Sequence, residues 1–330
     1  SFEMLVGLDI DWSVQPAFKS LLFVSTIMKI TVQSRNPKSS TFPLTLDVPG
    51  SPSSLKLTDL SKALHAKLPK FYPDRQRLTT EDKKALNLDQ TLAEQGLKDG
   101  SVVIFKDLGP QIGWRTVFLI EYGGPLLIHP LFYYLQKLIY HDQFVHSPMQ
   151  KTVYALCMLH FIKRELETVF VHRFSHGTMP FFNVFKNSAH YWFLSGFNLA
   201  FWVYGPWFAA GKSAAVRSDV WLYGCVAVWA WAQLSNLMTH ITLRNLRPPG
   251  SRTRKIPYGY GFDLVSFPNY FFESIAWLAV CFLSTSWSAF LFTIVAVGQM
   301  YVWAIKKHKA YKKEFPQYPK NRRAMFPFIA

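Results

Sequence analysis

Two side chains in apolar surroundings each have a chemistry that catalysis uses. Glu121 lies inside the apolar run at residues 113–135, which is long enough to span a bilayer. An ionisable group at that depth is costly and commonly faces a cavity where it takes part in catalysis or transport. Tyr270 lies in another apolar stretch, where a phenol beside a cation or a hydrogen-bond donor is able to act as a general acid. A tyrosine at a membrane interface has the same sequence signature.

A basic segment follows the fourth apolar run. Four polar residues lie here at near-helical spacing: Asn236, His240, Arg244 and Arg247. Residues 244–255 also contain five cations. Arginine binds phosphate oxygens through its two-pronged guanidinium, so this segment suits a ligand with several phosphates. A cytosolic loop that contacts lipid headgroups explains the same charges, and the pattern leaves both interpretations open.

Histidine and cysteine spacing argues against a metal centre and against a disulfide framework. His172 and His176 are separated by three residues, but the other histidines form no further pair of this kind for a second set of ligands. Cys157, Cys225 and Cys281 lie far apart in apolar segments, which predicts small buried side chains. The chain has no glycine-rich dinucleotide motif and no P-loop lysine motif, so no soluble Rossmann site is expected.

The elements that must position these groups are apolar runs after residue 112. The chain has 330 residues, of which 50% are apolar and 17% aromatic, and a net charge of +16. Because the basic residues lie beside apolar runs, these values favour a membrane protein that contacts anionic ligands or lipids over a nucleic-acid binder. Six runs have the length of a transmembrane helix. They lie at about residues 113–135, 149–170, 188–205, 218–243, 262–283 and 286–304.

Charged residues refine this arrangement. The loop at 244–261 and the tail after residue 304 carry most of the loop cations, so both termini are predicted to be cytosolic. Two runs contain charges and are therefore expected to be partly buried within the bundle. The second ends on Lys163, Arg164, Glu165 and Glu167, and the fifth contains Asp263 and Glu273.

The first third of the chain is polar and predicts a separate domain. Residues 1–27 lack the basic start of a signal peptide and are expected to be a weakly ordered extension. Residues 28–107 have the order β-β-α-β, which is similar to a ubiquitin-like fold, although a plain α+β domain has the same elements. The expected strands and helix lie at 28–33, 42–48, 57–68 and 101–106.

The predicted fold is thus an all-α multi-pass membrane bundle of about six helices at residues 108–330, preceded by an α+β ubiquitin-like domain. Several segments, read together, resemble one enzyme family. They are GPQIGWRTVFLIEYGGPL, ELETVFVHRFSHGTMPFFNVFKNSAHYW, LRNLRPPGSRTRKIPY, VSFPNYFFESIAW and QMYVWAIKKHKAYKKEF. The family is that of the very-long-chain trans-2-enoyl-CoA reductases, in the steroid 5α-reductase superfamily, and the resemblance covers about residues 28–330.

This resemblance implies an activity and a location. The reaction would be the NADPH-dependent reduction of a double bond next to a thioester, which completes each cycle of fatty acid elongation in lipid and sphingolipid metabolism. The enzyme would lie in the endoplasmic reticulum membrane, act on a very-long-chain enoyl-CoA and work beside other elongation enzymes, without a metal ion or nucleic acid.

The resemblance also implies roles for single residues. Tyr270 would be the proton donor, and Glu121 the acidic partner that orients or tunes it. Arg164 matches a basic position in the second run, with no role assigned. The family's NADPH site maps onto Asn236, Arg244, Arg247, Asn269, Glu273, His308 and Tyr311.

Two departures from the steroid branch bear on the substrate. That branch has a tyrosine where Phe161 stands and an aspartate where His240 stands, so neither residue is assigned a catalytic role and a 3-ketosteroid substrate is disfavoured. Two alternatives stay open. One is a steroid or polyprenol reductase of the same fold, and the other is a non-catalytic membrane adaptor that presents a ubiquitin-like domain.

Overall fold

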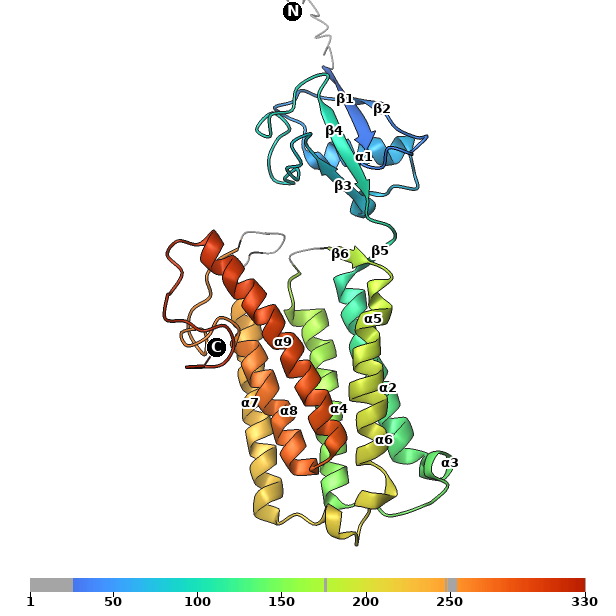
Figure 1. Cartoon of the computed structure of the whole chain (residues 1–330), viewed down its shortest axis with the longest axis vertical. Coiled ribbons are helices and arrows are strands. Elements are labelled where there is room, and N and C mark those ends of the chain that lie inside the picture. The colour runs from blue at the N-terminus through green and yellow to red at the C-terminus, as the bar shows by residue number, and fades with distance from the viewer. Residues whose placement is uncertain (1–25, 175–176, 247, 249–253, 330) are drawn as a thin grey trace, which may run out of the picture. The chain divides into compact units, whose positions relative to one another are not determined.

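Two separate hydrophobic cores organise the chain, one before and one after the bond between Leu108 and Gly109. The computed structural model describes residues 26–174, 177–246, 248 and 254–329 (Figure 1). The predicted extension therefore lies outside the described residues, except at its last two positions. The assignments of residues 1–27 as an extension, 28–107 as a ubiquitin-like domain and 108–330 as a membrane-embedded reductase domain stay predictions.

A four-stranded sheet forms the N-terminal unit, in the order β2-β1-β4-β3 (Figure 1). β1 (Ile27–Ser34) pairs antiparallel with β2 (Leu44–Pro49) and parallel with β4 (Val102–Asp107). β3 (Gln76–Thr79) pairs antiparallel with β4. Alternate residues of β1 are buried, which is the period-two pattern of a strand with one face in a core.

The helix α1 (Leu57–Lys67) completes the core of this unit. Leu60 and Leu64, four residues apart on one helix face, are fully buried against the strands. The predicted strands and helix are confirmed by β1, β2, α1 and β4. The sequence did not predict β3 or the short 3-10 helix η1 (Pro73–Arg75) before it.

Helices make up the second unit, which confirms the helical bundle. β5 (Gln111–Gly113) pairs with β6 (Thr178–Pro180), and the connections contain α3 (Gln136–Tyr140), η4 (Pro206–Phe208) and η5 (Ser213–Ala215). The remaining elements are α2 (Trp114–Tyr134), α4 (Pro148–Leu166), the π-helical η2 (Glu167–Val171), α5 (Asn183–Ala189), the π-helical η3 (His190–Asn198), α6 (Leu199–Val203), α7 (Asp219–Asn245), α8 (Pro268–Ser284) and α9 (Trp287–Glu314).

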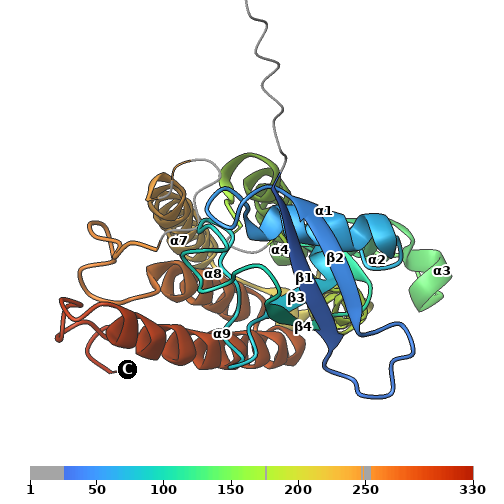
Figure 2. The same cartoon turned by 90° about the horizontal axis from the view of Figure 1, so that it is seen from above.

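The helix α4 lies in the middle of this bundle. It contacts α2, α7 and α8, while α7 packs on α8 and α8 packs on α9 (Figures 1 and 2). α4 begins with a well-formed cap, in which the Ser147 hydroxyl accepts from the backbone N–H of Gln150 and Pro148 takes the first helical position. Polar side chains on α4 are thereby carried into contact with three other helices.

Each of the six predicted apolar runs is helical, with two differences. The third run is not one helix but α5, η3 and α6 joined end to end. The helix of the fifth run, α8, begins at Pro268 and not at residue 262, because proline favours the first helical position. Asp263 therefore lies in the preceding turn, where its carboxylate accepts from the backbone N–H of Gly259.

Burial of the charges in the second run is confirmed, since Glu167 exposes only 2% of its surface. The three cysteines are free and buried, as predicted. By length and composition, one helix in the described part of the chain, α9, is apolar enough to cross a bilayer. Passage of all six helices through a membrane stays a prediction.

Candidate active site

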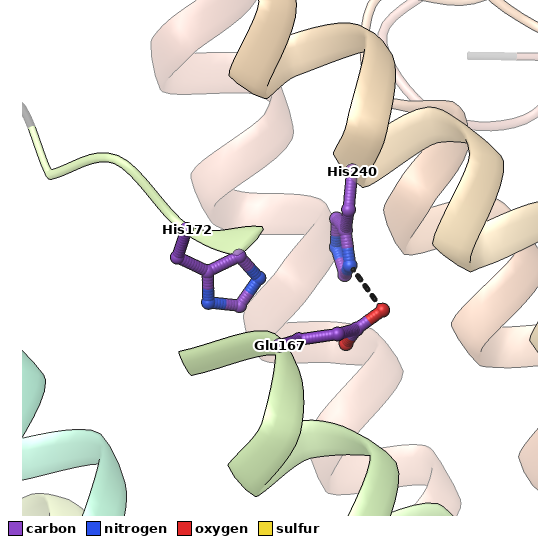
Figure 3. A group of neighbouring side chains, drawn as sticks. All are labelled: Glu167, His172 and His240. Atoms are coloured by element: carbon purple, nitrogen blue, oxygen red, sulfur yellow. Dashed lines mark hydrogen bonds and ion pairs between the residues drawn. The ribbon is translucent and has the colours of Figure 1, made fainter. Parts of the chain in front are cut away.

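The carboxylate of Glu167 lies at the centre of a buried ion cluster. Its Oε1 atom is 2.8 Å from Lys163 Nζ and 3.1 Å from His240 Nδ1, and its Oε2 atom is 3.0 Å from an Arg164 guanidinium nitrogen. Figure 3 shows the contact with His240, and His172 beside both groups. The His172 and His240 ring centroids are 4.9 Å apart. Three side chains, two from α4 and one from α7, therefore converge on one carboxylate of η2.

Local spacing explains how α4 and η2 contribute to this ion cluster. Lys163 and Arg164 precede Glu167 by four and three residues, so all three side chains share one helix face. The packing of α7 brings His240 to the same carboxylate. A buried charge is tolerated only when it is paired, and removal of one partner typically costs about 3–5 kcal/mol. The ion cluster thus fixes α4 relative to α7.

Glu167, His172 and His240 offer three potential metal ligands, whose atoms lie within 4.8 Å of one another. However, Lys163 and Arg164 already engage both carboxylate oxygens, and two adjacent cations oppose the binding of a third. Burial lowers the pKa of His172 to about 3, and the positive charge of Arg164 is the second cause. This imidazole is therefore neutral at physiological pH. The geometry fits an ion-paired pocket better than a metal centre.

Asn236 connects the ion cluster to α8. Its Oδ1 atom accepts from Lys163 Nζ at 2.6 Å, and its Nδ2 atom donates to the backbone oxygen of Asn269 at 2.8 Å. The same nitrogen is 3.3 Å from Glu273 Oε2. Three of the residues predicted to bind a cofactor, Asn236, Asn269 and Glu273, are thus brought together.

A histidine on α4 extends this contact. His160 Nε2 lies 3.6 Å from Glu273 Oε1, and His160 Nδ1 lies 2.8 Å from the side-chain nitrogen of Gln233. Because the Gln233 amide nitrogen donates, Nδ1 accepts and the ring proton lies on Nε2, toward Glu273. The amide therefore sets the tautomer of a histidine that faces a buried carboxylate.

Glu121 is buried on α2, next in sequence to a residue of this network. Tyr122 accepts a hydrogen bond from Arg164 at 2.6 Å, with the guanidinium 4.9 Å from the ring centroid. Glu121 exposes 2% of its surface, and its carboxyl lies beside the side chain of Asn187. Its Oε1 atom has no hydrogen-bond partner among the described residues. The structure thus places an incompletely paired carboxyl next to the cationic side of the ion cluster.

Tyr270 lies in the first turn of α8 and contacts α9. Its hydroxyl accepts a hydrogen bond from Lys307 Nζ at 2.9 Å, and its ring stacks on Phe267 with centroids 5.7 Å apart. No hydrogen bond joins Tyr270 to Glu121, although both lie in the described part of the chain. The immediate partner of this phenol is therefore a lysine.

A chain of hydrogen bonds and ion pairs nevertheless runs between the sequence neighbours of Glu121 and Tyr270. It begins beside Glu121 on α2, crosses α4 and α7, and ends beside Tyr270 on α8. The members of this polar chain are Tyr122, Arg164, Glu167, Lys163, Asn236 and Asn269.

Other predicted cofactor residues lie in different surroundings. Arg244 is in the last turn of α7. On α9, His308 Nδ1 is 2.6 Å from Ser266 Oγ, and the ring of Tyr311 stacks on Tyr318 with centroids 5.5 Å apart. These two residues form part of the contact between α9 and the C-terminal segment. Arg247 and His176 lie outside the described residues.

Three buried polar atoms, two within the polar chain and one on the residue before its first member, lack a hydrogen-bond partner among the described residues. They are Glu121 Oε1, Arg164 Nε and Asn269 Oδ1. Buried polar groups are almost always paired, and each unpaired one costs about 1–3 kcal/mol. Amide, guanidinium and carboxyl groups are the types that bind the carboxamide, hydroxyls and phosphates of a nicotinamide dinucleotide. The residues present therefore fit such a cofactor.

Sequence reasoning did not assign Lys163, Glu167 or Lys307 to this site, nor Tyr122, His160 or Gln233. The first two are opposite charges four residues apart inside an apolar run, and that spacing could have identified them as a buried pair. Lys307 is one of several lysines at the end of α9, and no local pattern separates it from its neighbours.

Known proteins are similar to this chain over most of its length. Residues 177–330 match the family described as 3-oxo-5-alpha-steroid 4-dehydrogenase. A Schizosaccharomyces pombe protein named as an enoyl reductase is 49% identical, over 92% of this chain and 100% of that protein. A very-long-chain enoyl-CoA reductase of Dictyostelium discoideum is 39% identical, over 84% and 93%. A trans-2,3-enoyl-CoA reductase-like protein of Mus musculus is 32% identical, over 82% and 76%.

These similarities confirm the resemblance stated above. Oxidoreductases of this kind act on an acyl-CoA and use a nicotinamide cofactor, and the steroid dehydrogenase match indicates a membrane protein. The helical bundle and its buried polar chain agree with both. The chain therefore belongs to the enoyl-CoA reductases of the steroid 5α-reductase superfamily.

Proposed function

We propose that this protein reduces very-long-chain trans-2-enoyl-CoA to the saturated acyl-CoA with NADPH, the last step of the fatty acid elongation cycle. The observation that carries this proposal is the polar chain between the neighbours of Glu121 and Tyr270, with its three unpaired atoms. Without a polar ligand to hydrogen-bond with them, these buried atoms lower the stability of the folded protein.

The cofactor proposal follows from the types of side chain present. Bound NADPH would supply the hydride that reaches the β-carbon of the substrate. Asn236, Asn269 and Glu273 would hold its nicotinamide end, because amides and carboxylates pair with carboxamide and hydroxyl groups. Arg244 and Arg247 would hold its phosphates through their guanidinium groups. His308 and Tyr311 would line the α9 side of the site.

Tyr270 would supply the proton. Hydride addition at the β-carbon leaves negative charge on the thioester enolate, and the Tyr270 hydroxyl then transfers its proton to the α-carbon. The Lys307 ammonium, 2.9 Å from that hydroxyl, stabilises the phenolate that remains. A general acid in such a step contributes about 10²–10⁴-fold to the rate.

Glu121 would act on the substrate and not on Tyr270 directly, because no hydrogen bond joins the two side chains. Its carboxyl has an unpaired Oε1 atom in a buried setting. A protonated carboxyl there donates to the thioester oxygen as negative charge develops on it. Donors placed in this way are worth about 10²–10³-fold in rate.

We place the enzyme in the endoplasmic reticulum membrane, with six passes and both termini cytosolic, beside other elongation enzymes. Helices at all six predicted runs and the cations of the loop at 244–261 support this arrangement. The strand order β2-β1-β4-β3 with one covering helix supports a ubiquitin-like N-terminal domain. That domain would be a docking surface for other proteins, and nucleic acid is not an expected partner.

A steroid or polyprenol reductase is the alternative within the same superfamily. Phe161 is fully buried, with its ring centroid 6.0 Å from that of Trp277, so it has no hydroxyl to offer a ketone. His240 is held by Glu167. A non-catalytic adaptor is disfavoured because it would bury the polar chain without use.

The test is turnover by the purified full-length protein in detergent micelles. We expect loss of NADPH absorbance with trans-2-octadecenoyl-CoA and formation of octadecanoyl-CoA. Turnover only with a steroid enone or a polyprenol would favour the alternative reductase. Turnover with none of these substrates would favour the adaptor, and equal rates with NADH would overturn the choice of NADPH.

A further inference from the structure

We propose that a groove between α8 and α9 holds the acyl chain of the enoyl thioester, an inference that rests on the proposed function. The two helices lie side by side (Figures 1 and 2), and two residues of the C-terminal segment also line the groove. The groove has a volume of about 470 Å³, which is within the range of small-molecule sites. Its walls include Ser274, Leu278, Val297, Gly298, Phe326 and Ile329.

The walls of this groove suit a hydrocarbon. Three lining residues, Ser274, Thr293 and Tyr301, have hydroxyl groups. The hydroxyls of Ser274 and Thr293 already have partners. Ser274 Oγ donates to the backbone oxygen of Tyr270 at 2.8 Å, and Thr293 Oγ1 is 3.1 Å from Cys281 Sγ. No lining residue is charged. A polar ligand would therefore lose its hydrogen bonds with water here, whereas an acyl chain has none to lose.

The groove lies next to the proposed proton donor. Ser274 follows Tyr270 by one helical turn, or about 6 Å along the axis of α8. Tyr270 also packs in one apolar cluster with Val297, Tyr301 and Phe326, all of which line the groove. A thioester placed at the Tyr270 hydroxyl would thus have its acyl chain at the mouth of the groove.

Charge complementarity fixes the direction of the substrate. Beyond the groove, α9 continues past Tyr270 into a run of lysines, of which Lys307 bonds the Tyr270 hydroxyl. The phosphates of coenzyme A are anionic and favour that end. The acyl chain then runs in the opposite direction along α8 and α9. The other lysines in this part of α9 are Lys306, Lys309, Lys312 and Lys313.

Gly298 makes this proposal testable. Gly298 lines the groove, and a Cβ atom added there meets nothing within 4 Å, so the backbone accommodates a larger side chain. Gly224 on α7 is also exposed and open within 4 Å, and it does not line the groove. Substitution of Gly224 is therefore a matched control for the loss of a helical glycine.

The experiment compares Gly298→Leu and Gly224→Leu on trans-2-hexenoyl-CoA and trans-2-octadecenoyl-CoA. The short chain does not extend along the groove, and the long chain does. We expect Gly298→Leu to lower kcat/KM for the long substrate about tenfold or more and to change the value for the short one less than twofold. Gly224→Leu should leave both values within twofold. Equal losses on both substrates in Gly298→Leu, or no loss on either, would overturn the proposal.

A second measurement separates the groove from the proposed reaction. An octadecanoyl-CoA analogue with a diazirine at the end of its chain is irradiated with the wild-type protein, and the attached peptide is identified by mass spectrometry. We expect attachment to α8, α9 or the C-terminal segment, competed by octadecanoyl-CoA. Attachment there without turnover would retain the groove and reject the reductase, whereas turnover with attachment elsewhere would reject the groove. Attachment that free bilayer lipid displaces and octadecanoyl-CoA does not would identify a lipid site.

Discussion

Lys307 on α9 donates a hydrogen bond of 2.9 Å to the Tyr270 hydroxyl on α8. Its ammonium also lies 5.4 Å from the centroid of the Tyr270 ring. An ammonium at this distance stabilises the negative charge that develops on the Tyr270 oxygen as its proton is transferred. We infer that Lys307 is a positioning residue, which acts on the reaction through Tyr270.

We predict that Tyr270→Phe lowers kcat about 10²–10⁴-fold, because the proposed general acid is removed while the ring is kept. NADPH affinity, measured by fluorescence titration, should change little. Tyr260→Phe is the matched control, since it also removes a phenol hydrogen bond, at 2.7 Å from Ser235 Oγ. A Tyr270→Phe enzyme with a near-normal rate would remove this residue from the mechanism.

Replacement of Lys307 tests the positioning role. Lys307→Met should lower kcat about 10–100-fold, because a hydrogen bond to a charged group is worth about 1.5–3 kcal/mol. Lys307→Arg, which keeps a cation beside the phenol, should recover part of the rate that Lys307→Met loses. Lys137→Met, a change at an exposed lysine of α3, should leave kcat unchanged. A Lys307→Arg enzyme as slow as Lys307→Met would mean that the positive charge is not what assists Tyr270.

Glu121→Gln should lower kcat about 10²–10³-fold while NADPH binding persists. The amide keeps the size of the side chain, but it is a much weaker acid than a carboxyl group. It therefore stabilises the developing charge on the thioester oxygen less. Glu314→Gln serves as the control, because Glu314 is exposed and pairs with Arg254 on the surface. Full activity in Glu121→Gln would mean that the buried carboxyl is structural.

The ion cluster should determine the stability of the bundle. Glu167→Gln leaves Lys163 and Arg164 buried without their carboxylate, so we expect a loss of about 3–5 kcal/mol. Thermal unfolding in detergent micelles measures it. The double variant Lys163→Met/Glu167→Gln should recover part of the loss, because one unpaired charge is removed with its partner. A single variant as stable as the wild type would contradict the role of the ion cluster.

Sequence patterns predicted the fold wherever one helix or strand corresponds to one apolar or alternating segment of the sequence. The strands β1, β2 and β4 alternate, and the runs of α2, α4, α7, α8 and α9 are apolar over helical lengths. The third run is harder because π-helical turns in η3 leave the apolar composition unchanged and only shift the periodicity. β3 was missed because its four residues are too few to show alternation.

The site was predictable only where one segment contains the signal. Glu121 is conspicuous because it interrupts an apolar run, and its burial followed from that context. The contact between Tyr270 and Lys307 joins residues 37 positions apart on two helices, and no spacing rule relates them. The convergence of Lys163 with Asn236 depends likewise on the packing of α4 and α7. Tertiary packing, and not local pattern, decides which charged groups become partners.

In the proposed reaction, hydride reaches the β-carbon of an enoyl thioester and a solvent-derived proton reaches the α-carbon. The direct measurement is mass spectrometry of the octadecanoyl-CoA formed with NADPH labelled by deuterium at either face of the nicotinamide C4. We expect one of the two labelled cofactors to place one deuterium at C3 of the acyl chain. In deuterated water with unlabelled NADPH, one deuterium should appear at C2. Unlabelled product with both cofactors, cofactor-derived label at C2, or no saturated product would contradict this account.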